Sequence, residues 1–438
     1  MVFFLPFSGH ALTSQTTANQ IQGSAPYLTF DGGRTRAVDT NGLLGITLSD
    51  GTKYTPSTNT SSSSAPIVLT VAGQSFADIR MFVPTDTTSV ALSSLIGPPN
   101  NYWGDDDGDS GVTATGSLSL SIVDKNNQSV SRNSVLTTCN SPYKVTLSST
   151  NGTLSTRYGF PNRSTFRESS VTYYVNPKAS PVVCFARPDR YYSTGRYAGP
   201  ASMWDPAKGF LTQETDPSRY GQNFPTTGLN GLYFDLDISG VSQPLYWSPV
   251  SQGGITVTMS NSTATSVRVT LTGPYATQSQ INSSNPSRVS TPSLPQTFEL
   301  VGRDTNGTPV VKYGFTLKQW FVNTGSVKKN YSNTLSWCNS LGYRLPKVKD
   351  LTNASCPNNH FDCRGSVTAT PSSPGNWYMR HIGSGFFTEW GDMRYYSVGF
   401  SPNYAYWASD QYFVVGHDWG NVVSKNSYET WSTLCAHP

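Results

Sequence analysis

Helical periodicity is confined to one stretch of this 438-residue chain, and this restriction limits its possible folds more than any other feature. Upstream of Ser332, apolar and polar residues alternate in short runs separated by turn residues, as in strands with one buried face. The clearest runs are YLTF, LLGITL, APIVLTVAG, SLSLSIV, YKVTLSS, GITVTMS and TSVRVTLTG. This pattern predicts a mainly β protein with immunoglobulin-like β-sandwich domains.

Turn residues suggest where strands pair and where segments end. Asn151-Gly152 and Asn306-Gly307 each lie between alternating runs, which favours tight hairpins. Pro and Ser cluster between residues 274 and 297, which indicates a soft segment boundary.

The helical stretch, Tyr331 to Ala354, predicts two short helices joined by a turn. Ser332 is expected to cap the first helix and Gly342 to end it in a left-handed conformation. Pro346 is expected to open the second helix, where its missing N–H does no harm. Beyond Ala354 the pattern indicates strands and loops.

The six cysteines form an even set, which in an exported chain favours disulfides and an oxidising compartment. Their number alone leaves the connectivity open. Cys356-x6-Cys363, with His360 between, resembles half of a zinc site but lacks a second ligand pair. We therefore expect disulfides and no metal at the cysteines, and we expect no cofactor.

Composition points to a folded recognition protein. Charged residues make up only 13% of the chain and aromatic residues 12%, the opposite of a disordered chain. The 24 tyrosines suit recognition, because Tyr offers contact area at little entropic cost. The formal net charge of +4 is not gathered into a basic stripe, which argues against nucleic-acid binding.

Residues 1–11, MVFFLPFSGHA, place small residues after a short apolar run, as at the end of a secretory signal peptide. We expect a remnant of such a peptide, although the basic n-region is missing; an apolar strand is the alternative. No apolar run reaches the roughly 20 residues that a membrane-spanning helix needs. These features predict an exported protein.

Motifs of the common enzyme classes are missing from the sequence. It contains no His-Glu-x-x-His, phosphate loop, dinucleotide fingerprint or Gly-x-Ser-x-Gly. Asp235 and Asp237 in LYFDLDIS would share one face of a strand, and paired carboxylates can hydrolyse glycosides. Because two Asp on an outer strand face are more often solvated, we expect no catalysis and no catalytic residue.

An acidic stretch, NYWGDDDGDSG, places Asp105, Asp107 and Asp109 alternately, as oxygen ligands are placed in calcium loops. An EF-hand is excluded, because Ser110 and Gly116 stand where its loop needs Gly and Glu. A looser calcium site and a solvated acidic turn both remain open.

The order of elements in the C-terminal part resembles a C-type-lectin-like module: a strand, two helices, a long irregular loop, and strands closing on a late cysteine. The pieces that carry this resemblance are Lys318-Gln319-Trp320-Phe321-Val322, Trp337-Cys338, Arg344-Leu345-Pro346, Tyr406-Trp407-Ala408-Ser409 and Cys435. The resemblance implies an α+β domain over residues 310–438, with Trp320 and Trp407 in its core.

The same resemblance implies a disulfide between Cys338 and Cys435. Proximity then suggests a pair inside the long loop, and the two remaining cysteines would pair upstream. The expected pairs are Cys338 with Cys435, Cys356 with Cys363, and Cys139 with Cys184.

Several upstream blocks resemble the invasin-E-type adhesion domain of enterobacterial invasin and intimin-like surface proteins. They are FARPDRYY, GPASMWDPAKGF, NFPTTGLNGLYFDLDISG, LPQTFELVGRD and YGFTLKQWFVN. With the lectin-like pieces they cover roughly residues 130–438, and they imply adhesion without naming a ligand. The expected domains are a β-rich region at 12–129, a β-sandwich adhesion domain at 130–300, and the lectin-like domain at 310–438.

Calcium-dependent lectins of this fold use Glu-Pro-Asn or Gln-Pro-Asp in the long loop and Trp-Asn-Asp on a later strand. This chain has Ser401-Pro402-Asn403, without the carboxylate, and His417-Asp418-Trp419, in another order. The departure argues against calcium-dependent sugar binding.

Aromatic and arginine side chains in the long loop and beside the last strands remain as binding candidates. They are Trp377, Tyr378, Arg380, Tyr404 and Trp419. Trp, Tyr and Arg dominate binding hot spots. The alternative is that these side chains only pack the loops.

We therefore expect an exported bacterial adhesin, secreted or on the surface of a Gram-negative cell, that binds a host cell-surface or extracellular-matrix protein. A lectin that binds a glycan is one alternative. Another is a secreted partner of a separately encoded outer-membrane barrel, with a structural or regulatory role.

Overall fold

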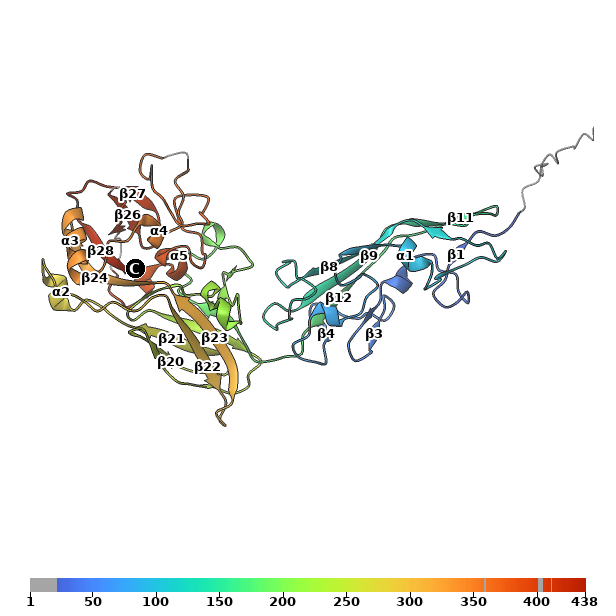
Figure 1. Ribbon diagram of the computed structural model, residues 1–438, viewed down its shortest axis with the longest axis horizontal. Coiled ribbons are helices and arrows are strands. Elements are labelled where there is room, and N and C mark those ends of the chain that lie inside the picture. The colour runs from blue at the N-terminus through green and yellow to red at the C-terminus, as the bar shows by residue number, and fades with distance from the viewer. Residues whose placement is uncertain (1–21, 358–359, 401–404, 411) are drawn as a thin grey trace, which may run out of the picture. The chain divides into compact units, whose positions relative to one another are not determined.

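The computed structural model describes residues 22–357, 360–400, 405–410 and 412–438, which form two compact units (Figure 1). Residues 22–136 and 140–178 make up unit 1, and residues 137–139 and 179–438 make up unit 2. The expected signal-peptide remnant, the Ser401-Pro402-Asn403 motif and Tyr404 lie outside the described residues. Within the described residues, no helix is both long and apolar enough to cross a membrane.

Unit 1 is built almost entirely of short strands. Its elements are β1 (Tyr27–Leu28), η1 (Asn41–Leu43), β2 (Ile46–Thr47), β3 (Lys53–Tyr54), β4 (Ile67–Val68), η2 (Phe76–Asp78), β5 (Ser89–Ala91), α1 (Ser93–Ile96), β6 (Trp103–Gly104), β7 (Thr113–Ala114), β8 (Ser117–Val123), β9 (Tyr143–Ser149), β10 (Gly152–Ser155), β11 (Arg163–Phe166) and β12 (Ser169–Asn176). The main sheet has the order β4-β12-β9-β8-β5, and β11-β10-β7 forms a second sheet. Alternate residues of β9, such as Val145 and Leu147, point into the core.

Two sequence predictions fail in unit 1. The boundary expected near residue 130 falls inside the main sheet, because β8 and β9 pair across it, with Leu120 opposite Leu147. Asn151-Gly152 does not close a hairpin, because β9 pairs with β8 and β12 while β10 pairs with β7 and β11. The chain changes sheets at this pair, where a side chain on Gly152 would overlap the ring of Phe166.

Unit 2 begins with a β-sandwich. Its elements are β13 (Val182–Arg187), η3 (Gly195–Tyr197), β14 (Trp204–Asp205), β15 (Gly209–Leu211), η4 (Pro217–Gln222), β16 (Thr227–Leu229), β17 (Tyr233–Ser239), β18 (Tyr246–Trp247), β19 (Val250–Gln252), β20 (Ile255–Ser260), β21 (Ser266–Thr272), α2 (Gln278–Asn282), β22 (Gln296–Arg303) and β23 (Pro309–Leu317). One sheet has the order β14-β15-β13-β17-β21-β20-β19 and the other β18-β22-β23. Phe234 of the first packs edge-on against Phe315 of the second, with ring centroids 6.0 Å apart.

The C-terminal part of unit 2 is α+β. Its elements are β24 (Gln319–Lys329), α3 (Tyr331–Leu341), α4 (Val348–Leu351), α5 (Phe386–Trp390), η6 (Met393–Tyr395), β25 (Ala405–Trp407), β26 (Phe413–Gly416), β27 (Val422–Ser424) and β28 (Trp431–His437). Its sheet has the order β16-β24-β28-β25-β26-β27. Trp320 and Trp407 are fully buried, as predicted. The strand–helix–helix–loop–strand order agrees with the expected layout, and the lectin-like identity stays a prediction.

The ends of the two predicted helices differ in detail from expectation. Asn330, not Ser332, caps α3, because its side chain accepts a hydrogen bond from the Asn333 N–H. Gly342 ends α3 with φ of 86°, as predicted. The second helix begins at Val348, so Pro346 lies before it and does not open it.

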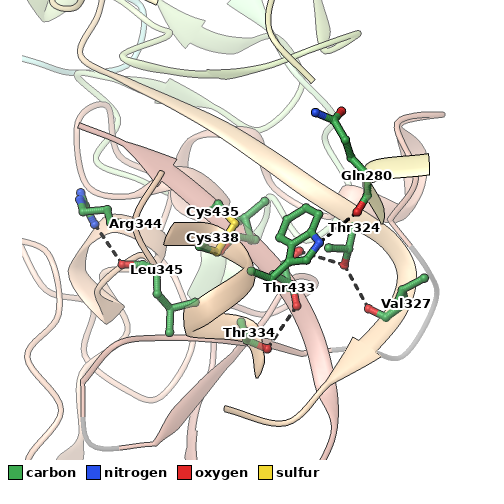
Figure 2. Close-up of a disulfide and its surroundings, with 11 residues drawn as sticks. Gln280, Thr324, Val327, Thr334, Cys338, Arg344, Leu345, Thr433 and Cys435 are labelled. Atoms are coloured by element: carbon green, nitrogen blue, oxygen red, sulfur yellow. Dashed lines mark hydrogen bonds between the residues drawn. A yellow bond between two sulfur atoms is a disulfide. The ribbon is translucent and has the colours of Figure 1, made fainter. Parts of the chain in front are cut away.

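Three disulfides join Cys139 to Cys184, Cys338 to Cys435 and Cys356 to Cys363, which are the expected pairs. The bond between Cys338 and Cys435 ties α3 to β28 across 97 residues of sequence (Figure 2). Beside it, the hydroxyl oxygens of Thr334 and Thr433 lie 3.3 Å apart. Covalent and polar contacts therefore fix α3 on the last strand.

The sandwich and the α+β part share one continuous core, contrary to the boundary expected between residues 300 and 310. That boundary falls between β22 and β23, which form the hairpin predicted from Asn306-Gly307. A buried carboxylate also joins the two parts: Glu389 of α5 accepts hydrogen bonds from the N–H groups of Thr226 and Thr227, at 3.0 Å each. The sandwich and the α+β part therefore form one unit.

Candidate binding surface

Three segments of unit 2, distant in sequence, come together around Trp377 and Trp419. The Tyr378 N–H donates to the carbonyl of Trp419 at 2.7 Å, which joins the long loop to the β26–β27 turn. The Arg380 N–H donates to the carbonyl of Tyr197 at 2.9 Å, which joins the same loop to η3. Backbone hydrogen bonds therefore hold all three segments in one place.

Tyrosine and tryptophan rings gather on this part of the surface. We call the set Tyr191, Tyr192, Trp377, Tyr395 and Trp419 the aromatic patch. The ring centroids of Tyr191 and Tyr395 lie 4.9 Å apart, and those of Tyr192 and Trp419 lie 6.1 Å apart. Tyr191 is 47% exposed, Tyr395 49% and Trp419 41%.

Trp377 is only partly exposed and lies against an arginine. The Arg196 guanidinium lies 4.7 Å from the centroid of the Trp377 ring and 5.0 Å from that of Tyr197. The Trp377 indole N–H donates to the carbonyl of Arg196 at 3.2 Å. This cation–π contact orders Arg196 at the edge of the aromatic patch.

Two of the predicted binding residues support the aromatic patch from below instead. Tyr378 and Arg380 are fully buried, so neither offers contact surface to a partner. The Arg380 guanidinium donates to the carbonyls of Glu389 at 3.0 Å and Asp189 at 2.7 Å. It also lies 4.8 Å from the Trp204 ring centroid. Arg380 therefore fixes the loop that carries Tyr191.

A cavity of about 180 Å³ adjoins the aromatic patch and is lined in part by Arg187, Asp189, Arg190 and Tyr395. Removal from water raises the pKa of Asp189 to about 6, although the Arg380 charge opposes this shift. The Asp189 carboxylate accepts a hydrogen bond from the Tyr191 N–H at 3.0 Å. Asp189 therefore holds the backbone of the exposed Tyr191.

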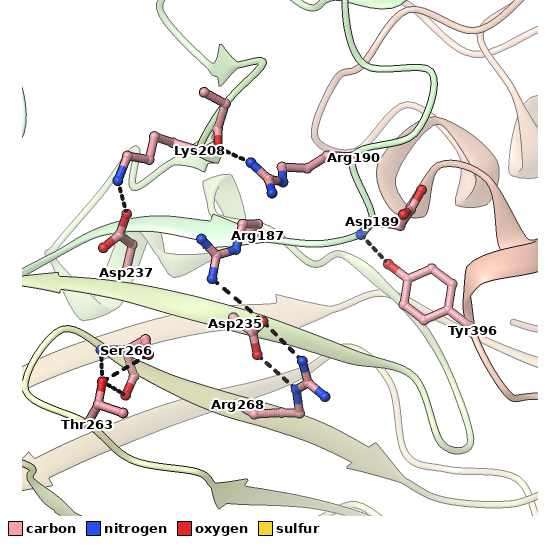
Figure 3. Close-up of polar contacts among 11 residues, drawn as sticks. Arg187, Asp189, Arg190, Lys208, Asp235, Asp237, Thr263, Ser266, Arg268 and Tyr396 are labelled. Atoms are coloured by element: carbon pink, nitrogen blue, oxygen red, sulfur yellow. Dashed lines mark hydrogen bonds and ion pairs between the residues drawn. The ribbon is translucent and has the colours of Figure 1, made fainter.

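Asp235 and Asp237 lie on one face of β17, as predicted, and each is in an ion pair (Figure 3). Arg268 donates to the two oxygens of Asp235 at 2.9 and 3.2 Å. The Lys208 ammonium lies 3.0 Å from Asp237. Both carboxylates are therefore paired with basic side chains.

In unit 1, Asp105, Asp107 and Asp109 bring carboxylate oxygens within 4.8 Å of one another. The carboxylate of Asp105 also accepts hydrogen bonds from the N–H groups of Asp107, at 2.9 Å, and Asp109, at 3.4 Å. Hydrogen bonds between the Asp105 side chain and the backbone thus stabilise the loop.

Tyr191 and Tyr395 were missed as candidates from the sequence. A repeated triplet, Arg-Tyr-Tyr, at residues 190–192 and 394–396, marks both positions. In each copy the first tyrosine is exposed and the second more buried, and the two exposed rings contact each other. The repeated triplet was therefore a sequence signal that could have identified Tyr191 and Tyr395 as candidate binding residues.

No protein-family model and no curated protein matches this chain. Among solved structures, a crystal structure of invasin, a bacterial integrin-binding protein, matches with 14% identity and a TM-score of 0.37, over 76% of this chain and 52% of that one. The C-terminal 282-residue fragment of intimin, solved with the intimin-binding domain of the translocated intimin receptor, matches with 12% identity and a TM-score of 0.33, over 74% of this chain and 93% of that one. The chain thus spans about half the length of the invasin chain it resembles.

Proposed function

We propose that this protein is an exported bacterial adhesin that binds a protein on another cell or in the extracellular matrix, through the aromatic patch and without catalysis. The observation that carries the proposal is the group of three exposed rings, Tyr191, Tyr395 and Trp419, gathered on one surface of unit 2. Large aromatic side chains dominate the energy of protein–protein binding.

The support beneath the aromatic patch favours binding as well. Arg380 anchors the loop of Tyr191 through the backbone carbonyls of Asp189 and Tyr191, and the Trp377 loop is tied to the β26–β27 turn. A surface already fixed in one conformation loses less entropy when a partner binds. The aromatic patch therefore presents contact area at low ordering cost.

The test is binding of the purified full chain to host cells, to immobilised extracellular-matrix proteins, to a glycan array and to outer-membrane extract. The variants are Tyr191→Ala, Tyr395→Ala and Trp419→Ala. A matched control is Tyr246→Ala, since Tyr246 on β18 is 64% exposed and outside the aromatic patch.

Saturable binding to host cells or matrix protein is expected, weakened tenfold or more by each patch variant, which corresponds to about 1.4 kcal/mol. The control variant should bind like the unaltered chain. Binding confined to outer-membrane extract would instead favour the exporter-partner role, and hits on the glycan array alone would favour a lectin.

A further inference from the structure

The cavity beside the aromatic patch has room for a single side chain. It shares Tyr395 with the patch, so a partner that contacts Tyr395 also lies beside the cavity. Its volume of about 180 Å³ is below the roughly 300–1000 Å³ of pockets that enclose whole small-molecule ligands. A protruding group from a larger partner fits this size.

Arg187 has guanidinium N–H groups that no carboxylate in the cavity binds closely. Asp235 already accepts two hydrogen bonds from Arg268. The nearest Arg187 nitrogen is 3.7 Å from the Asp235 carboxylate, beyond hydrogen-bond distance, and the Arg187 side chain is 29% exposed. Arg187 therefore adds little to a carboxylate that is already paired.

A second arginine, Arg190, also lines the cavity, and Figure 3 shows it with Arg187. Arg190 is exposed and donates to the carbonyl of Ala207. Within the described part of the chain, no carboxylate forms an ion pair with it. The remaining carboxylate of the cavity, Asp189, is turned toward the Tyr191 N–H. With Arg268, which binds Asp235, three guanidinium groups therefore stand against the two carboxylates of the cavity, which leaves an excess of positive charge.

We propose that this cavity receives the carboxylate of an Asp or Glu side chain from the bound protein, held between Arg187 and Arg190. The inference rests on the proposed function, since neighbouring residues of the partner would cover the aromatic patch. Guanidinium–carboxylate hydrogen bonds are charge-assisted, directional and stronger than neutral ones. The expected recognition element is therefore an acidic residue next to apolar or aromatic residues.

The experiment selects random peptides of about 12 residues, displayed on phage, against the full chain. Selected peptides are then synthesised with their acidic residue kept or replaced by the matching amide. Their affinities are measured for the unaltered chain, for Arg187→Gln and for Arg190→Gln. Arg303→Gln is the control, because exposed Arg303 also donates to a loop carbonyl, that of Gly307, outside the cavity.

Selected peptides are expected to share an Asp or Glu, and the amide replacement should weaken binding to the unaltered chain and to Arg303→Gln tenfold or more. On Arg190→Gln the same replacement should change affinity less than threefold. Because Arg187 is partly buried, Arg190→Gln keeps the test valid should Arg187→Gln fold poorly.

The carboxylate assignment would be overturned if the selected peptides share no acidic residue. It would also be overturned if the amide replacement weakened binding equally for the unaltered chain and for all the arginine variants. Displacement of the peptides by sialyllactose with no acidic residue selected would also overturn it, in favour of an acidic sugar. If the carboxylate assignment alone is wrong, Tyr191→Ala and Trp419→Ala still weaken binding to host cells. If the proposed function is wrong, they do not.

Discussion

One guanidinium group, that of Arg380, holds the loop of the aromatic patch in place. Arg380→Gln is expected to lower the free energy of unfolding by about 3 kcal/mol, because the buried carbonyl of Glu389 and the partly buried carbonyl of Asp189 lose their donor. Chemical denaturation measures the loss. Exposed Arg190→Gln is the control, expected to stay within about 0.5 kcal/mol. Superimposable curves for Arg380→Gln and the unaltered chain would contradict this role.

Asp189 makes stability depend on pH in a defined direction. Burial raises its pKa from 3.8 to about 6, so the folded state holds its proton more tightly than the unfolded state does. Its stabilising contribution is full below about pH 4 and is lost as pH rises through about 6. The melting temperature of Asp189→Asn, relative to the unaltered chain, should therefore rise between pH 4 and pH 7. A relative melting temperature that falls over this range would show that the sign is wrong.

At the scale of single residues, the sequence marked the Trp377–Arg380 loop as a binding candidate but did not indicate which of its side chains face outward. Trp377 and Trp419 lie on the surface, whereas Tyr378 and Arg380 are buried. The difference depends on partners such as Asp189, 191 positions away from Arg380. In an irregular loop no periodicity links neighbouring side chains to a face, so contacts of this range decide their direction.

Among the elements, the attachment of α3 to β28 is covalent and closes the longest loop of the three disulfides. Replacing both Cys338 and Cys435 by Ala should lower the free energy of unfolding by about 4–5 kcal/mol in the chain-entropy model. The same change at Cys356 and Cys363, only 7 residues apart, should cost about 2 kcal/mol. Chemical denaturation compares the two double variants. Equal losses, or the reverse order, would contradict the loop-length argument.

Helix ends and turns that depend on nearby residues were predictable from the sequence, whereas strand pairings that depend on distant residues were not. Gly342 ends α3 and Asn306-Gly307 turns the β22–β23 hairpin, because both depend on the residue's own backbone freedom. Asn151-Gly152 carries the same local preference but connects two different sheets. Which strands pair is decided by contacts far along the chain, so an identical dipeptide gives two outcomes.

In the whole molecule, the α+β part depends on the sandwich part of unit 2. An isolated fragment of residues 310–438 would lose β16, the neighbour of β24, and the Thr226 and Thr227 donors to buried Glu389. We expect this fragment to unfold without a sharp transition and to bind hydrophobic dyes. Thermal unfolding followed by circular dichroism, beside the full chain, tests this. A cooperative transition at the temperature of the full chain would show that residues 310–438 fold alone.

The most direct test of the central claim is site-specific photo-crosslinking of the full chain to host cell surfaces. A photoreactive phenylalanine analogue replaces Tyr191, Tyr395 or, as control, exposed Tyr246. Partner adducts are expected from the first two positions and not from the third, since only they belong to the aromatic patch. Adducts from Tyr246 without any from Tyr191 and Tyr395 would contradict the assignment of the aromatic patch as the binding surface.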